Sequence, residues 1–159
     1  MVIIEDTRQQ EGKHKAKHTY FEKHEIRVVR SKLPVGDYAK ITDMTTIVDT
    51  KKDIQEVCGN VTKGHKRFVG ECDLAAECGI KLIILIDDKK VSCLDDLETW
   101  ENPRLKYSPK ATTGITLAKI LRGMEMRHGV KFEFCHPRDS GKRVLELLNV
   151  QIGEDEKCG

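Results

Sequence analysis

The sequence predicts an α/β fold, a central mixed β-sheet flanked by α-helices. Short runs rich in β-branched residues alternate with helix-like segments from end to end, without an internal repeat or a low-complexity linker. The continuous apolar run at residues 82–86 is typical of a strand buried on both faces of a sheet. The chain of 159 residues is 38% hydrophobic, which is enough for one core. We expect residues 1–150 to form one domain and residues 151–159 to be an acidic, disordered tail.

The first third of the chain predicts two strands, a helix and a hairpin. Residues 2–4 and 26–29 are β-rich, and residues 14–24 between them show helical spacing of apolar side chains. Residues 35–41 and 46–48 alternate as the two strands of a β-hairpin, with a polar turn at residues 42–44.

The remainder alternates helices with two further strands. The helices end or begin at recognisable signals, such as Gly79 after one helix, Pro103 after another and Thr113 as an N-cap. The expected helices are residues 53–60, 66–78, 94–100, 113–127 and 141–148, the strands are residues 81–86 and 130–135, and residues 102–113 are irregular between them.

Composition excludes several classes of protein. No apolar run approaches the roughly 18–20 residues that span a bilayer, and the acidic Glu5 and Asp6 interrupt any signal peptide, so we expect no membrane association. The six cysteines form no C-x-x-C pair, which favours reduced thiols and an intracellular location. The sequence has neither a phosphate-binding G-x-x-x-x-G-K-[ST] loop nor a G-x-S-x-G nucleophile motif.

Positive charge is concentrated near the N-terminus. Residues 8–32 contain eight basic and three acidic residues, with histidines between them. Such a segment suits a polyanionic partner, although a solvated helix face has the same composition. Both interpretations remain open on charge alone.

The predicted hairpin brings three side chains together. If its turn is centred on Asp43, Asp37 lies opposite Asp49, and Lys51 points to the same face. Facing carboxylates repel each other unless a cation lies between them or one is protonated. Hard oxygen ligands suit Mg²⁺ or Mn²⁺, and a neighbouring lysine would orient a water and offset charge on a phosphate. A solvent-facing hairpin with a surface ion pair is the alternative.

Three ordered motifs resemble the XPF-type (xeroderma pigmentosum group F) nuclease domain, a member of the restriction-endonuclease-like superfamily. They are D-T-R-Q at residues 6–9, V-G-D-Y at residues 35–38 and V-D-T-K at residues 48–51. The family pattern has D-x-R-E, then G-D, then E-R-K followed by an acidic residue. With matching elements between the motifs, the resemblance covers nearly the whole chain.

The resemblance implies a role for each matching position. Asp37, Asp49 and Asp6 would ligate Mg²⁺ or Mn²⁺, Lys51 would be the catalytic lysine, and Arg8 would contact phosphate or brace the carboxylates. These five residues form the expected catalytic set. The basic residues expected to contact DNA are Arg67, Lys66, Lys13, Lys15, Lys17 and Lys106.

The sequence departs from the family pattern at three places. Gln9 replaces the glutamate of D-x-R-E, and Asp49-Thr50-Lys51 replaces E-R-K. The acidic residue expected four positions after the lysine falls at Gln55, for which Glu56 and Asp53 are candidate substitutes.

The resemblance implies a metal-dependent DNA endonuclease that acts on branched, flap or junction DNA, in repair, recombination, or a phage or mobile-element context. A catalytically inactive DNA-binding module that assists an active nuclease is the alternative, as is an α/β domain whose motifs coincide by chance. A homodimer or a separate nuclease partner are the assemblies left open.

Overall fold

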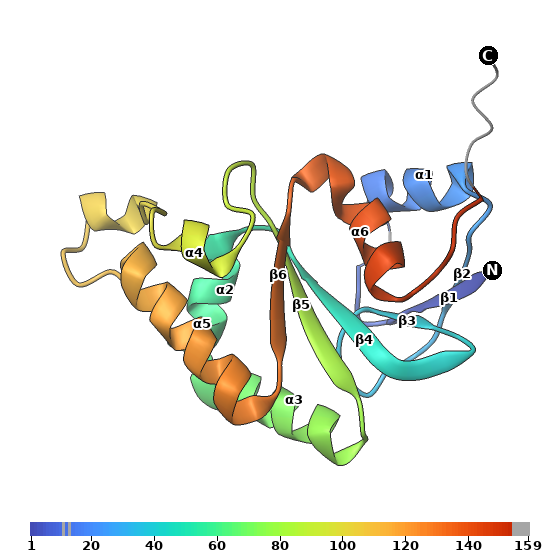
Figure 1. The fold of residues 1–159 in the computed structure, drawn as a ribbon, viewed down its shortest axis with the longest axis horizontal. Helices are drawn as coiled ribbons and strands as arrows, with labels where there is room; N and C mark the ends of the chain where they lie inside the picture. The colour runs from blue at the N-terminus through green and yellow to red at the C-terminus, as the bar shows by residue number, and fades with distance from the viewer. Residues whose placement is uncertain (11, 13, 154–159) are drawn as a thin grey trace.

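The computed structural model describes residues 1–10, 12 and 14–153, which fold around a six-stranded sheet of order β2-β1-β3-β4-β5-β6 (Figure 1). Strand β3 runs antiparallel to both of its neighbours, and the other adjacent pairs are parallel, so the sheet is mixed as expected. The strands are β1 (Val2–Glu5), β2 (Arg27–Arg30), β3 (Tyr38–Lys40), β4 (Asp43–Lys51), β5 (Lys81–Asp87) and β6 (Lys131–Cys135).

Helices cover both faces of the sheet. In Figure 1, α1 and α6 lie on one side, whereas α2, α3 and α5 lie on the other with α4 near the beginning of α5. The helices are α1 (Lys15–Lys23), α2 (Ile54–Val61), α3 (His65–Glu77), α4 (Leu94–Leu97), α5 (Gly114–His128) and α6 (Ser140–Leu147), with 3-10 turns η1 (Pro103–Lys106) and η2 (Pro137–Asp139).

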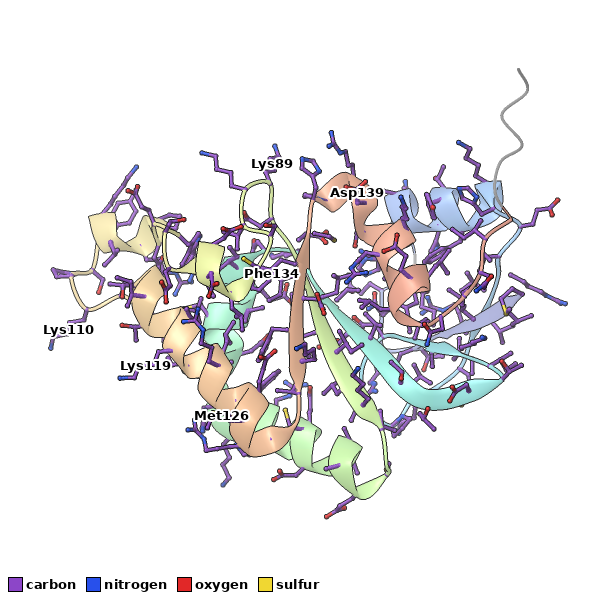
Figure 2. The ribbon with its side chains drawn as sticks, viewed as in Figure 1. Lys89, Lys110, Lys119, Met126, Phe134 and Asp139 are labelled. Carbon is purple, nitrogen blue, oxygen red and sulfur yellow. The ribbon has the colours of Figure 1, made fainter. Side chains whose placement is uncertain are left out.

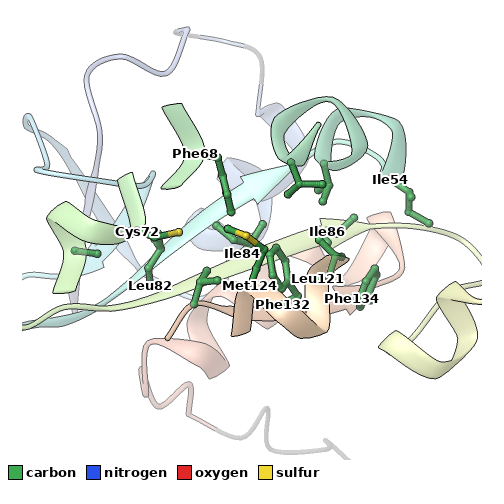
Figure 3. Close-up of a cluster of buried hydrophobic side chains, with 14 of the residues drawn as sticks. Ile54, Phe68, Cys72, Leu82, Ile84, Ile86, Leu121, Met124, Phe132 and Phe134 are labelled. Carbon is green, nitrogen blue, oxygen red and sulfur yellow. The ribbon is translucent and has the colours of Figure 1, made fainter. Parts of the chain in front are cut away.

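Strand β5 joins the two hydrophobic cores. Ile84 and Ile86 pack with α2, α3 and α5, as Figure 3 shows, whereas Ile83 and Leu85 belong to the cluster beneath α1 and α6. Successive side chains of a strand point to opposite faces, so a strand covered by helices on both sides must be apolar throughout. Each such side chain contributes about 1.5–3 kcal/mol when buried. The prediction of a buried central strand is confirmed.

The hairpin keeps its predicted central register but has a different turn. Tyr38 pairs with Val48 and Ala39 with Ile47, and a shift between Ala39 and Lys40 then pairs Lys40 with Asp43. The chain therefore reverses at residues 41–42, and the expected turn at residues 42–44 is wrong. Residues 44–46 of β4 lie between the pairs that Ala39 and Lys40 form, where β3 has no intervening residue, and this bulged stretch permits the shorter turn. The first hairpin strand, expected at residues 35–41, is also shorter, because residues 35–37 and residue 41 form no strand.

Two other elements differ from expectation. Helix α4 ends at Leu97 rather than continuing to residue 100, and residues 103–106 of the segment expected to be irregular form η1. Residues 151–153 have no regular structure, and residues 154–159 of the expected tail lie outside the described residues. No helix among the described residues has the length and apolar character that crossing a bilayer requires.

Candidate active site

A cleft of about 300 Å³ opens at the edge of the sheet where β1 and β4 end and β3 begins. It gathers eight of the residues singled out from the sequence. These are Asp6, Arg8, Gln9, Asp37, Asp49, Lys51, Glu56 and Arg67. Their roles remain predictions, but their proximity is a property of the fold.

Backbone pairing brings the three motifs to this edge. The backbone N–H of Asp6 donates to the carbonyl of Asp37 at 2.8 Å. The backbone N–H of Asp37 donates to the carbonyl of Val48 at 2.9 Å. Gly36 permits this close approach, because it has a φ of +70° and a Cβ there would lie 2.6 Å from Cγ2 of Ile47. The glycine before Asp37 is therefore required by the backbone.

Thr50 orients the carboxylate of Asp37. Its backbone N–H and its hydroxyl donate to the same oxygen, Oδ2, at 2.8 and 2.9 Å. Thr50 thus fills the middle position of the third motif with a residue that holds another site residue in place.

Asp49 is the buried member of the carboxylate pair, with only 8% of its surface exposed. Burial raises the pKa of Asp49, and the nearby carboxylate of Asp37 raises it further. Lys51 opposes this rise in the pKa, because its Nζ lies 3.0 Å from Oδ2 of Asp49. A cation between the two carboxylates would relieve the same repulsion.

Lys51 is held in its charged form. Burial lowers the pKa of Lys51, but the carboxylate of Asp49 outweighs this effect and the net pKa is raised, with further contributions from Glu56 and Asp37. An ammonium can orient a water or bind a phosphate oxygen, whereas it cannot accept a proton.

Asp6 is committed to contacts within the protein. Its Oδ1 accepts the backbone N–H of Leu33 at 2.7 Å, and its Oδ2 accepts both the backbone N–H and Nε of Arg8. Burial raises the pKa of Asp6, but these hydrogen bonds outweigh that effect and the net pKa is lowered. The geometry makes Asp6 a brace for Arg8, whose Nη2 also donates to the carbonyl of Leu33.

Sequence reasoning missed Glu5, which anchors the loop that carries Asp6 and Arg8. Glu5 is 1% exposed and accepts hydrogen bonds from His18, Arg30 and Tyr38 at 2.6, 2.6 and 2.8 Å. Arg30 also donates to the carbonyl of Gln9 at 2.7 Å. The alternation of side chains along the strand could have revealed this role. Glu5 lies two residues after Ile3, so both side chains point to the same face of the sheet, toward the core.

Glu56 and Asp53, the candidate substitutes for the acidic residue missing at position 55, occupy different places in the structure. Glu56 lines the cleft, whereas Gln55 lines a different cavity. Asp53 is the N-cap of α2 and accepts the backbone N–H of Glu56 at 2.8 Å. Oε1 of Gln9 is buried in the cleft wall without a hydrogen-bond partner among the described residues.

Of the basic residues expected to contact DNA, Arg67 alone lines the cleft, within the described part of the chain. Lys17 lies in an adjoining cavity that shares His14 with the cleft. Lys15, Lys66 and Lys106 are exposed elsewhere on the surface, and Lys13 lies outside the described residues. The cleft also contains His14 and Glu71, which were not among the expected site residues.

The residues of the cleft suit a divalent cation of the Mg²⁺ class. Asp37 and Asp49 supply hard oxygen ligands, and Mg²⁺ commonly binds through one or two carboxylates while retaining waters. Within the described residues, no cluster of three or more His, Cys, Asp or Glu side chains is arranged to hold a metal by itself. A site completed by water and phosphate oxygens is consistent with both observations.

The fold of the chain is similar to that of solved structures. The structure is similar to XPF from Aeropyrum pernix, with a TM-score of 0.64, 15% identity and coverage of 94% of this chain and 61% of that one. A second structure of XPF from Aeropyrum pernix, in complex with DNA, has a TM-score of 0.62 and 16% identity. That match covers 94% of this chain and 64% of the other. This chain therefore spans less than two thirds of those structures, and the likeness confirms the restriction-endonuclease-like fold.

No curated protein sequence matches the chain. The ERCC4 domain matches residues 5–148, a range that contains the three motifs and the cleft. The chain belongs to the ERCC4 domain family.

Proposed function

We propose that this chain is a Mg²⁺- or Mn²⁺-dependent DNA endonuclease of the XPF type. The observation that carries the proposal is the convergence of Asp37, Asp49 and a charged Lys51 in one cleft of an ERCC4 domain. A carboxylate pair beside an ammonium suits hydrolysis of a phosphodiester, in which negative charge develops on phosphate oxygens.

Asp37 and Asp49 would hold the metal ion, which when bound supplies Lewis-acid activation of a phosphate oxygen and of a water. Thr50 keeps Asp37 in a single orientation, so the pair is organised before substrate arrives. Lys51 orients the attacking water and offsets charge on the phosphate. Arg8, braced by Asp6, extends an exposed guanidinium into the same cleft, where it would bind a neighbouring phosphate oxygen.

We propose DNA as the substrate, because one of the similar structures is a complex with DNA. Branched, flap or junction DNA is the expected form, in repair, recombination, or a phage or mobile-element context. A homodimer or a separate nuclease partner would complete the assembly, and an intracellular location fits a DNA substrate.

The competing candidate is an inactive DNA-binding module. Gln9 favours it, because an amide stands where the family motif has a carboxylate, and its buried oxygen has no partner within the described residues. The carboxylate pair and Lys51 favour an active site instead.

The test is cleavage of labelled duplex, single-stranded, flap and Holliday-junction DNA with Mg²⁺ or Mn²⁺. Wild-type protein should cleave, and Asp49→Asn should not. The control variant Glu77→Gln, which changes an exposed residue outside the cleft, should cleave like the wild type. Binding without cleavage by the wild type would support the inactive module. Cleavage that survives in Asp49→Asn would contradict the proposed site.

A further inference from the structure

A second cavity, of about 400 Å³, lies between α2 and the segment of residues 102–112 that links α4 to α5. Its cationic lining residues are Lys63, Arg104 and Lys110, and no carboxylate from the described part of the chain lines it. The remaining lining residues are uncharged and mostly small or polar, among them Gln55, Asn102 and Ser108.

The three cations of this cavity have no anionic partner among the residues that the structure describes. Within residues 1–10, 12 and 14–153, no ion pair involves Lys63, Arg104 or Lys110, although twelve ion pairs occur elsewhere in that part of the chain. Clustered like charges repel, and an anion that enters the cavity would relieve this repulsion. The lining therefore selects for an anionic ligand.

The segment that carries Arg104 and Lys110 is held in one shape. Asn102 is buried, its Nδ2 donates to the carbonyl of Thr112 at 2.9 Å, and its Oδ1 accepts the backbone N–H of Arg104 at 3.0 Å. The backbone N–H of Ser108 donates to the carbonyl of Arg104 at 2.8 Å. A cavity whose wall is ordered in advance binds with less loss of conformational entropy.

Tyr107 lies on the same segment with 89% of its surface exposed. It stands between the exposed Lys106 and the cavity-lining Ser108, and it belongs to neither hydrophobic core. An exposed aromatic ring beside unpaired cations is the combination that binds single-stranded nucleic acid, with bases stacked on the ring and phosphates on the cations. Figure 2 shows Lys110 projecting from this end of the molecule.

Helix α2 separates this cavity from the candidate active site. Glu56 lines the active-site cleft, whereas the adjacent Gln55 lines the basic cavity. A strand that leaves the cleft across the beginning of α2 would therefore reach the cavity within a short stretch of backbone.

We propose that the basic cavity and Tyr107 form a second nucleic-acid contact, which holds an unpaired strand of the substrate. Phosphates would occupy the cavity lined by Lys63, Arg104 and Lys110, and a base would stack on Tyr107. This inference rests on the proposed function, because it assigns the single-stranded arm of a branched DNA to a particular surface.

The test measures binding of a labelled blunt hairpin duplex and of the same duplex with a 15-nucleotide single-stranded tail, in EDTA so that cleavage plays no part. Wild-type protein should bind the tailed DNA more tightly. Tyr107→Ala should weaken binding of the tailed DNA about 5- to 150-fold and of the blunt DNA less than twofold, while Tyr107→Phe retains wild-type affinity. The combined Arg104→Gln and Lys110→Gln variant should reduce the salt slope for the tailed DNA by about 1.4.

Two variants on α5 serve as controls. Lys119→Gln removes one exposed positive charge and Met126→Ala removes one side chain that is 88% exposed, both outside the cavity (Figure 2). Neither should change the preference for tailed DNA. Equal losses on blunt and tailed DNA, unchanged binding in the cavity variants, or a wild type without preference for the tail would each overturn the inference.

Binding in EDTA also separates this inference from the proposed nuclease activity. A protein that cleaves no DNA but shows a Tyr107-dependent preference for the tail would retain the second contact and lose the proposed function. Cleavage with no dependence of binding on Tyr107 or the cavity would retain the proposed function and overturn the second contact.

Discussion

Oδ2 of Asp37 accepts two hydrogen bonds from Thr50, one from the backbone and one from the hydroxyl. Both residues belong to motifs that are separate in sequence, and the hairpin brings them together. The backbone donor is present with any non-proline residue, so the hydroxyl is the contribution specific to Thr50.

Thr50→Val should lower cleavage about tenfold and weaken the apparent affinity for Mg²⁺, because Asp37 loses one of its two orienting donors. Thr50→Ser should retain activity. Cleavage rates over a Mg²⁺ titration would measure the effect, with Thr46→Val as the matched change on the same strand, outside the cleft. Equal activity in Thr50→Val and the wild type would show that the backbone donor suffices.

Glu56→Gln should weaken the apparent affinity for the metal and reduce cleavage, since Glu56 adds a carboxylate to the wall of the cleft. Gln55→Glu places an acidic residue four positions after Lys51, where the family pattern has one. It should not raise activity, because residue 55 lines the basic cavity and not the active-site cleft. Metal titrations of both variants would decide between the positions. Higher activity in Gln55→Glu would contradict the placement of α2.

The pKa of Glu5 predicts an acid-sensitive fold. Burial raises that pKa, but hydrogen bonds from His18 and Tyr38 and the charges of His18 and Arg30 outweigh it, so the pKa lies below its ordinary value of 4.5. As the pH falls, the carboxylate of Glu5 is therefore protonated at a higher pH in the unfolded chain than in the folded protein. The resulting stability is complete above pH 4.5 and is lost as the pH falls through the folded pKa.

Glu5→Gln should remove this part of the acid sensitivity and lower the free energy of unfolding at pH 7 by about 2 kcal/mol, a value limited by the partial exposure of Arg30 and His18. Denaturant unfolding between pH 3 and pH 7 would measure both effects. The exposed Glu77→Gln provides the control. An unchanged pH dependence in Glu5→Gln would assign the acid sensitivity to other groups.

Gly114→Ala should destabilise the protein by about 1–3 kcal/mol, because its Cβ would lie 2.5 Å from the carbonyl oxygens of Leu97 and Trp100. Gly70→Ala, within α3 and with open space around it, should instead stabilise the protein by about 0.5–1 kcal/mol. Thermal melts of the two variants would compare the same chemical change in two settings. A neutral Gly114→Ala would show that α5 can move away from α4.

Local patterns in the sequence predicted most of the fold. Each useful pattern spans only a few residues, so it can be interpreted without knowledge of the partner elements. Examples are the alternation of apolar and polar side chains at Val48 and Asp49, the apolar run of β5 and the N-cap Thr113. The hairpin register that brings Asp37 toward Asp49 was predictable for the same reason. The turn was not, since the bulge after Ala39 depends on how two strands meet.

The sequence by itself determined the class of the fold, the three motifs and their chemical type, because these depend on residue identity and short-range spacing. Only the tertiary structure decided that Glu56 rather than Gln55 faces the cleft, that Asp6 braces Arg8, and that Glu5 anchors their loop. These outcomes depend on contacts between residues far apart in the chain, such as Arg30 with Gln9 and Leu33 with Asp6. Burial and long-range hydrogen bonding set them, and neither is encoded in local periodicity.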